Sequence, residues 1–355
     1  MDEFQGRIRI KDIAEQAGVS VGTVDRVLHG RPNVSEKSRL KVEEILKKID
    51  YQPNMYASAL ASNKRYKFLC ILPQHKPGEY WSEVETGIHR AHQRYNDFNI
   101  HVEIFYYDPF HPETFADMST ELLKNEPDGV IINPTIMEYT SPFTDLLHEK
   151  DIPFVFVDSD LPQLHPLAFY AQHSQKSGYF AARMLKMLAP NCELGLFRQT
   201  FAGHVVRSNQ QREREAGFMQ YMKEHHPDTI IHTLELPAKN FGRQLDQMDE
   251  FFKAHPKMHA GISFNSKVFG VGEYLEKREI RDFRLMGYDH LDRNTEMVRN
   301  GWVDFLIDQH PWKQGYGCIQ ILVEYVILKK QVVRQNYVPI ELISKENVDF
   351  YNRTY

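Results

Sequence analysis

The sequence predicts an α/β protein that carries a helix-turn-helix module at its N-terminus and two doubly wound parallel-sheet lobes after it. From Tyr66 onward, short apolar runs alternate with amphipathic stretches, as strands and helices do in parallel sheets that are covered on both faces. This alternation falls into two sets of similar length, so we expect two lobes. Before Tyr66, apolar residues recur at helical spacing, which predicts a separate module of short helices.

The N-terminal stretch is expected to fold into three helices. The first runs from Ile10 to Ala17 and ends at Gly18, because glycine adopts a left-handed helix end without a side-chain penalty. Ser20 is expected to cap a second helix over 21–28. Two short helices joined by a glycine-containing turn form a helix-turn-helix unit. A third helix is expected from Ser35 to about Ile49, with Leu40, Val42, Ile45, Leu46 and Ile49 closing a small core.

The body is expected to hold nine strands in two sets. The first set is 67–72, 100–105, 129–133 and 153–157, and the second is 194–197, 229–233, 260–263, 284–287 and 303–307. Helices are expected between them, the first over 80–95 and the next from Pro112. In open parallel sheets, ligands bind beyond the carboxyl ends of the strands. The polar residues that follow these strands are therefore the candidates for a ligand site.

Charge and cysteine content point to a reduced protein with a basic N-terminal module. Residues 1–67 carry 13 Lys and Arg against 9 Asp and Glu, whereas the remainder carries 30 against 39. Cys70, Cys192 and Cys318 lie far apart and form no C-x-x-C pair, which favours free thiols. The start of the sequence has no signal-peptide pattern, and no run of about twenty apolar residues occurs. We expect a cytoplasmic protein with no membrane partner.

Motifs for catalysis are missing from the sequence. It contains no G-x-S-x-G elbow, no phosphate-binding glycine loop, no H-E-x-x-H and no G-x-G-x-x-G. We therefore expect no enzyme, no cofactor and no metal. Two alternatives remain open: an enzyme that uses Asp158 and Asp289 as the carboxylate pair of glycoside hydrolysis, and a ligand-binding protein of the same α/β fold.

The N-terminal stretch contains a series of short motifs, in order Asp12-Ile-Ala, Ala17-Gly-Val-Ser20, Thr23-Val24, Arg26-Val27-Leu28, Val34-Ser35, Tyr51-x-Pro53-Asn54 and Ala57-x-x-Leu60-Ala61. In these residues it resembles the headpiece and hinge of the LacI/GalR family of bacterial transcription regulators. The strand order of the body resembles the periplasmic sugar-binding fold of the same regulators. The resemblance implies a headpiece over 1–52, a hinge helix over 53–65 and an effector domain over 66–355.

The resemblance also implies three crossings between the lobes, expected near Gln172, Pro311 and Val332. One lobe would then hold 66–171 with 311–332, and the other 172–310 with 333–355. Residues 341–355 contain no leucine heptads, so a homodimer is expected rather than a tetramer.

Carried over from the family, the DNA-binding residues are Ser20, Val21, Gly22, Thr23, Asp25, Arg26, Asn33, Asn54, Ala57 and Leu60. Val21, Gly22 and Arg26 would meet base edges, and Leu60 would wedge into the minor groove. Thr23 and the backbone amides near Ser20 and Asn33 would hold phosphates. Asp25 departs from the family, where serine is usual. It is expected to accept a cytosine amine, to pair with Arg26 or Arg31, or to weaken binding.

The implied ligand-binding residues are Tyr80, Trp81, Asp158, Arg212, Phe241, Asn265, Asp289 and Gln309. Aromatic rings would stack on a sugar, while the carboxylates, amides and Arg212 would bind its hydroxyls. Alternatively, Asp158 and Asp289 could simply cap the helices that follow. A sugar or sugar derivative is the expected effector, and Arg198, His204 and Arg207 leave an acidic or phosphorylated sugar open. The predicted function is a repressor, or else an activator, whose binding to double-stranded operator DNA is set by this sugar-like effector.

Overall fold

The structure is a computed structural model. It describes residues 9–28, 31–49, 56, 59, 64–111, 113–134, 137–200, 208–237 and 241–351, without the side chains of 120, 200 and 241–243. The chain divides into two compact units, Met1–Ser62 and Asn63–Tyr355, called here the headpiece and the body. Among the described residues, no helix combines the length and the apolar character that crossing a membrane requires.

The headpiece contains the three expected helices: α1 (Ile10–Ala17), α2 (Val21–Leu28) and α3 (Glu36–Lys48). Gly18 ends α1 in the left-handed region at φ 62°. The Ser35 hydroxyl oxygen accepts the Ser38 amide at 3.2 Å, which caps α3. The core is built on Ile13, Ala14, Ala17, Val24 and Val42. The prediction was wrong for Leu40, which is 60% exposed because it lies on the outer face of α3.

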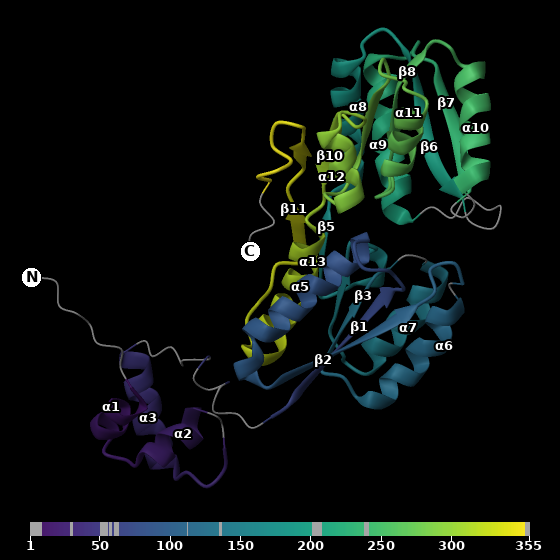
Figure 1. Cartoon of the computed structure of the whole chain (residues 1–355). Coiled ribbons are helices and arrows are strands. Elements are labelled where there is room, and N and C mark those ends of the chain that lie inside the picture. The colour runs from purple at the N-terminus through teal and green to yellow at the C-terminus, as the bar shows by residue number, and fades with distance from the viewer. Residues whose placement is uncertain are drawn as a thin grey trace, which may run out of the picture. The chain divides into compact units, whose positions relative to one another are not determined.

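The first lobe of the body is a six-stranded, fully parallel sheet in the order β11-β5-β4-β3-β1-β2. Its strands are β1 (Tyr66–Pro73), β2 (Ile100–Tyr107), β3 (Gly129–Ile132), β4 (Phe154–Val157), β5 (Ala168–Gln172) and β11 (Gln335–Val338). Figure 1 shows α5 (Tyr80–Arg94) and α13 (Pro311–Leu322) on one side of this sheet, and α6 (Glu113–Leu122) and α7 (Met137–Glu149) on the other. The sheet is thus buried on both faces.

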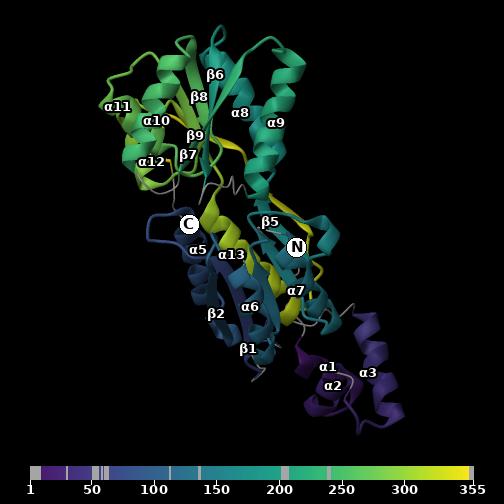
Figure 2. The same cartoon turned by 90° about the vertical axis from the view of Figure 1, so that its right-hand side faces the viewer.

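The second lobe repeats this architecture with the order β12-β10-β9-β8-β6-β7. Its strands are β6 (Glu193–Thr200), β7 (Ile231–Pro237), β8 (Met258–Ser263), β9 (Arg284–Tyr288), β10 (Phe305–Asp308) and β12 (Glu341–Ile343). Figure 2 shows α8 (Ser174–Leu188) and α9 (Asn209–His225) on one side, and α10 (Phe241–Ala254), α11 (Phe269–Lys277) and α12 (Asp292–Arg299) on the other. Only β12 runs antiparallel to its neighbour within this sheet.

Short helical turns complete the body at Asn96–Phe98, Leu123–Asn125 and Pro162–Leu164, and a π-helical turn at Val323–Ile327 extends α13. All nine expected strands are present, which confirms the predicted α/β fold. The sequence did not predict β5, β11 and β12, which lie at or next to the sheet edges.

The expected third crossing between the lobes is displaced. Residues 335–338 form β11, which pairs in parallel with β5 of the first lobe. The chain therefore crosses after Val338 and not near Val332, since the next strand, β12, begins at Glu341 and pairs with β10 of the second lobe. The other two crossings lie after Gln172, where β5 ends, and between Asp308, where β10 ends, and Pro311, where α13 begins.

Two pairs of helices approach each other closely through glycine. A Cβ at Gly217 of α9 would lie 1.9 Å from a carbonyl oxygen of α8, and one at Gly315 of α13 would lie 2.0 Å from a carbonyl oxygen of α5. Neither contact tolerates a side chain. These approaches matter because α9 carries Arg214 and α13 carries Gln314, both of which belong to the site described next.

Candidate ligand site and DNA-binding face

Two buried aspartates occupy equivalent places in the two lobes. Asp158 follows β4 and Asp289 follows β9, and both have left-handed backbones, with φ 74° and 75°. Their amides donate to the carbonyl oxygens of Tyr170 and Ile307, each at 2.9 Å. The exposed fractions of the two residues are 6% and 1%. Each lobe thus places one carboxylate at the carboxyl ends of its strands, where ligands bind in this class of sheet.

Asp158 is held by neutral groups of the first lobe. The Tyr80 hydroxyl, at the start of α5, donates to Asp158 Oδ1 at 2.6 Å. Gln314 Nε2 in turn donates to the Tyr80 hydroxyl at 3.2 Å and to the Gln309 carbonyl at 2.8 Å. The ring of Trp81 meets the Tyr80 ring edge-on, with centroids 5.2 Å apart. The structure therefore brings Tyr80, Trp81 and Asp158 together.

Asp289 belongs to a network that contains a buried cation. Gln309 Nε2 donates to Asp289 Oδ1 at 2.6 Å, and Gln309 Oε1 accepts from Arg214 Nη2. Arg214 Nη1 donates to the Phe264 carbonyl at 2.9 Å, and its guanidinium lies 4.2 Å from the Tyr288 ring centroid. Because Arg214 is only 3% exposed, these contacts replace its hydration.

The two lobes also meet directly at this point. Gln210 Nε2 of α9 donates to the Asp158 carbonyl at 3.1 Å. Asn209 Nδ2 donates to the Ser159 hydroxyl at 3.3 Å. We call Tyr80, Asp158, Gln210, Arg214, Asp289, Gln309 and Gln314 the polar cluster. It draws on both lobes and on the crossover that contains Gln309.

Burial dominates the electrostatics of the polar cluster. It raises the pKa of Asp158 to about 6, while the Tyr80 hydrogen bond and Arg214 act in the opposite direction. It raises the pKa of Asp289 to about 8, again against the effect of Arg214. Within the polar cluster, two buried polar atoms, Arg214 Nε and Gln314 Oε1, have no hydrogen-bond partner among the described residues. One is a donor and one an acceptor, so a hydroxyl-bearing ligand could satisfy both.

Of two neighbouring arginines on α9, the structure places Arg214 in the polar cluster, and not Arg212, which the sequence analysis expected there. Arg212 is exposed, and its Nη2 donates to Asn209 Oδ1 at 3.3 Å. Arg214 occupies the buried position instead. The sequence held a usable signal, because Gln210, Arg214 and the fully buried Phe218 recur at i, i+4 and i+8 on one face of α9, whereas Arg212 does not share that face.

Two other candidates lie outside the polar cluster as described. Asn265 supports the turn after β8, where its Oδ1 accepts from the Ser263 hydroxyl at 3.1 Å and from the Lys267 amide at 2.9 Å. The side chain of Phe241 lies outside the described residues. Helix capping does not explain Asp289, because α12 begins at Asp292 with Leu291 at its N-cap. Gln210, Arg214 and Gln314 were not among the predicted site residues.

The exposed face of α2 is the candidate DNA-binding surface. Val24 is fully buried, and Val21, Gly22 and Arg26 are exposed on the other side of this helix. The Ser20 hydroxyl caps the helix by accepting the Thr23 amide at 3.1 Å, and it lies 2.9 Å from the Thr23 hydroxyl. The first turn of α2 is therefore exposed to solvent, and the Ser20 cap holds it in helical form.

Of the options left open for Asp25, the structure shows the pair with Arg31. Arg31 Nη1 donates to Asp25 Oδ2 at 3.1 Å, which places a cation beside the carboxylate. Asn33 is exposed, with a left-handed backbone at φ 68°. Asn54, Ala57 and Leu60 lie outside the described residues.

Comparison with known proteins agrees with both units. Residues 69–330 match the family model of the periplasmic binding protein domain, and residues 9–54 match that of the bacterial regulatory proteins of the lacI family. The solved structure of a protein from Bacteroides fragilis that is classed as a LacI transcriptional regulator is 46% identical, with a TM-score of 0.78, over 81% of this chain and 100% of that one.

A glucose-galactose binding protein, GanP from Geobacillus stearothermophilus, is 18% identical with a TM-score of 0.69, over 80% of this chain and 99% of that one, which shows the fold alone. Catabolite control protein A from Staphylococcus epidermidis is 30% identical over 43% of this chain and 44% of that protein. The chain thus matches less than half the length of this curated relative.

The fold and the polar cluster define a class of protein in which a ligand-binding body of the periplasmic-binding type follows a helix-turn-helix headpiece. The chain belongs to the lacI family of bacterial regulatory proteins.

Proposed function

We propose that the chain is a transcription regulator whose headpiece binds a specific DNA sequence and whose body binds a small polyhydroxy ligand. The polar cluster is the observation that carries this proposal, because both lobes and the crossover between them contribute to it. A ligand bound there touches both lobes, so its affinity depends on how they are arranged. Differential affinity of this kind is what couples a ligand to a distant site.

Exposed residues of α2 support the DNA-binding part of the proposal. The second helix of a helix-turn-helix unit enters the major groove, where Arg26 can donate to guanine and Val21 can contact a thymine methyl group. Thr23 and the amides near Ser20 and Asn33 would hold phosphates. The ion pair with Arg31 offsets the charge of Asp25, which reduces its repulsion of the DNA backbone.

Several features of the polar cluster support a neutral sugar as the ligand. Carboxylates and amides accept and donate hydrogen bonds as hydroxyl groups require, and the rings of Tyr80 and Trp81 suit the apolar face of a sugar. Burial raises the pKa of both aspartates beside the one guanidinium, so the site already disfavours negative charge, and an anionic ligand would add more. Arg198, one candidate partner for an acidic sugar, is already paired with Glu215 and Glu235.

Coupling between the two functions would use the hinge over 53–65. There, Leu60 is proposed to wedge between base steps, and the small residues Ala57, Ala59 and Ala61 to let two hinge helices pack side by side. This arrangement requires a homodimer formed by the bodies and a pseudo-palindromic operator. A sugar-binding protein or sugar-acting enzyme without a regulatory role is less well supported, since neither needs a headpiece.

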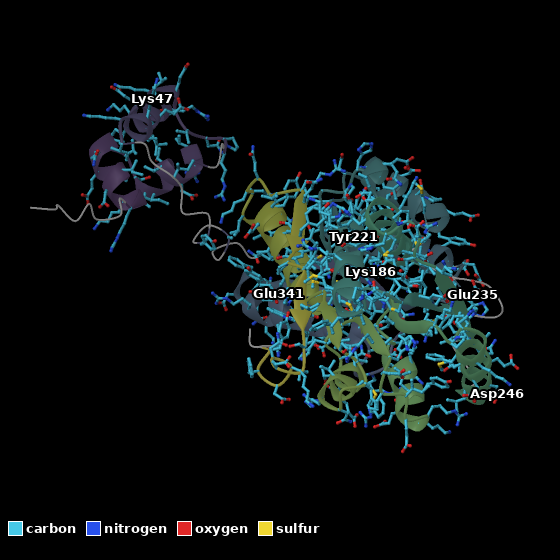
Figure 3. The ribbon with its side chains drawn as sticks, turned by 90° about the horizontal axis from the view of Figure 1, so that it is seen from above. Lys47, Lys186, Tyr221, Glu235, Asp246 and Glu341 are labelled. Atoms are coloured by element: carbon cyan, nitrogen blue, oxygen red, sulfur yellow. The ribbon has the colours of Figure 1, made fainter. Side chains whose placement is uncertain are left out.

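DNA binding is tested by selecting operators from a random duplex pool with the full chain and titrating the winners. We expect a pseudo-palindromic consensus. Arg26→Ala should reduce discrimination between operator and random DNA by tenfold or more, since a base contact contributes about 1–3 kcal/mol. Lys47→Ala removes the same charge from the exposed end of α3, labelled in Figure 3, and should preserve discrimination. A pool without any enriched sequence would refute the proposal.

Ligand binding is tested by a thermal-shift screen of the full chain against neutral mono- and disaccharides, sugar phosphates and uronic acids. A ligand at 100 times its Kd stabilises the protein by about 2.7 kcal/mol, which is easily detected. Arg214→Gln should abolish the shift, while Arg212→Gln, the exposed control on the same helix, should retain it. Stabilisation by uronic acids alone would contradict the neutral-sugar assignment.

A further inference from the structure

The three segments that cross between the lobes are tied together by one side chain. Gln172 lies at the end of β5, where the first crossing begins. Its Nε2 donates to the carbonyl of Asp308, at the second crossing, at 2.8 Å, and to that of Pro339, at the third, at 3.0 Å. Because Gln172 is 3% exposed, water competes little for these bonds. The three crossings therefore form one connected hinge between the two lobes. In this subsection 'hinge' means these crossings and not the hinge over 53–65.

A group of ionisable side chains stands on this hinge, and we call Asp308, His310, Glu341 and Tyr351 the hinge cluster. His310 Nδ1 lies 3.1 Å from Asp308 Oδ2, and His310 Nε2 lies 3.0 Å from Glu341 Oε2. The Tyr351 hydroxyl donates to Glu341 and lies 3.2 Å from Asp308 Oδ2 and 3.3 Å from His310 Nε2. One imidazole and one hydroxyl thus link two carboxylates. Figure 3 labels Glu341 in the body.

Each member of the hinge cluster comes from a different point of the hinge. Asp308 ends β10, and His310 precedes α13 with a left-handed backbone at φ 49°. Glu341 begins β12 directly after the third crossing. Tyr351 comes from residues 344–351, which follow β12 and are called here the C-terminal segment. Its ring lies nearly parallel to that of His310, with centroids 6.1 Å apart. The C-terminal segment is therefore anchored to the hinge through Tyr351.

Gln309 stands between two members of the hinge cluster in the sequence. Asp308 and His310 direct their side chains to Glu341 and Tyr351, whereas Gln309 directs its side chain to Arg214 and Asp289. The Gln309 carbonyl also accepts from Gln314. One three-residue crossover thus serves the hinge cluster and the polar cluster at once.

We propose that the hinge cluster positions Gln309 for ligand binding, and that Tyr351, far away in the sequence, is a positioning residue of the ligand site. With both neighbours of Gln309 tied down, the backbone of the crossover has little freedom to rotate. The inference rests on the proposed function only for its ligand readout, because the polar cluster exists without a ligand.

We expect the hinge cluster to loosen most easily when the Tyr351 hydroxyl is removed. Tyr351 also lines a cavity of about 1340 Å³ between α5, α12, α13 and the C-terminal segment. Its ring has room to move into this cavity once the hydroxyl contacts are lost. Glu341 and Asp308 would then keep only His310 between them. The Tyr351 ring also meets the ring of His290, which follows Asp289, edge-on with centroids 5.1 Å apart. Tyr351→Phe keeps this ring contact, so an effect of that variant on the ligand has to arise from the lost hydroxyl contacts at the crossover.

The first experiment needs no ligand: hydrogen exchange of the full chain, read by mass spectrometry. Tyr351→Phe, which keeps the ring, should speed exchange severalfold in peptides covering 305–316, and Glu341→Gln should act in the same direction. Tyr325→Phe is the control, because Tyr325 is exposed on the π-helical turn. Unchanged exchange in both hinge variants, with near-ultraviolet circular dichroism showing native folding, would overturn the proposal.

The second experiment measures affinity for a neutral sugar identified in the screen. Tyr351→Phe should weaken binding about three- to tenfold, Tyr325→Phe should leave it unchanged, and headpiece binding to DNA without sugar should stay the same in both. Equal sugar affinity in Tyr351→Phe and the wild type would refute the positioning role. If the wild type binds no sugar, the proposed ligand fails, and hydrogen exchange alone decides the positioning inference.

Discussion

The two lobes of the body have the same strand topology, but they surround their buried aspartates with different polar and charged groups. Each sheet has the same strand order, and each places an aspartate with a left-handed backbone after the equivalent strand. In the first lobe Asp158 is satisfied by a hydroxyl, from Tyr80. In the second lobe Asp289 is reached through Gln309, which also holds the buried cation Arg214.

The difference shows that equivalent backbone positions in the two lobes do not give their aspartates the same pKa. The pKa of Asp289 rises further than that of Asp158, although Asp289 is the nearer of the two to the cation in the hydrogen-bond network. Burial is the largest cause in both, and the charge of Asp308 raises the pKa of Asp289 further. Ionising Asp289 in the second lobe therefore costs more electrostatic free energy than ionising Asp158 in the first lobe. Substituting each aspartate can measure this difference.

The largest expected effect comes from removing the cation. Arg214→Met leaves the Phe264 carbonyl and Gln309 Oε1 without their donors in a buried site. It should lower the free energy of unfolding of the body by about 3 kcal/mol or more. Arg212→Met, on the exposed face of the same helix, should change it by less than about 0.5 kcal/mol. Urea unfolding followed by circular dichroism compares the two variants. Equal losses in the free energy of unfolding would contradict the buried position of Arg214 in the polar cluster.

The two aspartates should differ in the pH dependence of stability. A raised carboxyl pKa means that the folded protein binds the extra proton, so the stability contributed by that group falls as pH rises from its ordinary pKa to its folded pKa. Asp289→Asn should therefore raise the melting temperature at pH 8, and the gain should shrink towards pH 5, because the folded pKa is about 8. The gain from Asp158→Asn should level off above about pH 6.

Melting curves of the ligand-free chain at several pH values make this comparison. Asp246→Asn, at an exposed position of α10 labelled in Figure 3, is the control for the loss of one negative charge. A gain from Asp289→Asn that is the same at pH 5 and pH 8 would contradict the raised pKa.

A smaller effect is expected from the hydroxyl that serves Asp158. Tyr80→Phe removes a hydrogen bond to the carboxylate, so the pKa of Asp158 should rise above about 6 and stability at pH 8 should drop by about 1–2 kcal/mol. Tyr106→Phe removes a comparable but exposed bond to Glu85 and should cost less. Carboxyl carbon titration by NMR gives the pKa directly, and an unchanged value in Tyr80→Phe would argue against the bond.

The smallest effect should come from the direct contact between the lobes. Asn209→Ala removes the 3.3 Å bond to Ser159 and should change the free energy of unfolding by less than about 0.5 kcal/mol. Sugar affinity should change less than threefold, whereas Gln309→Ala should reduce it more than tenfold. If Asn209→Ala proved as damaging as Gln309→Ala, the lobes would be coupled through their surfaces and not through the crossover.

Local pattern was sufficient to predict the headpiece and most of the sheets. The left-handed Gly18, the Ser35 cap and the bounds of α1 and α2 depend on residues within a few positions of one another. Buried parallel strands are continuous apolar runs, so nine of them could be found from sequence. The edge strands β11 and β12 are short and half-exposed, and they carry no such signal.

The sequence also predicted one shared site for Asp158, Asp289, Gln309 and Tyr80, because each lies at the end of a strand or the start of a helix and matches the family pattern. What the tertiary structure alone decided is which side chains meet. Arg214 replaced Arg212 because burial on α9 depends on packing against α8. Gln314 reaches Tyr80, and Tyr351 reaches Asp308, across long stretches of chain. Such contacts join residues that lie far apart in the sequence, so no local pattern encodes them.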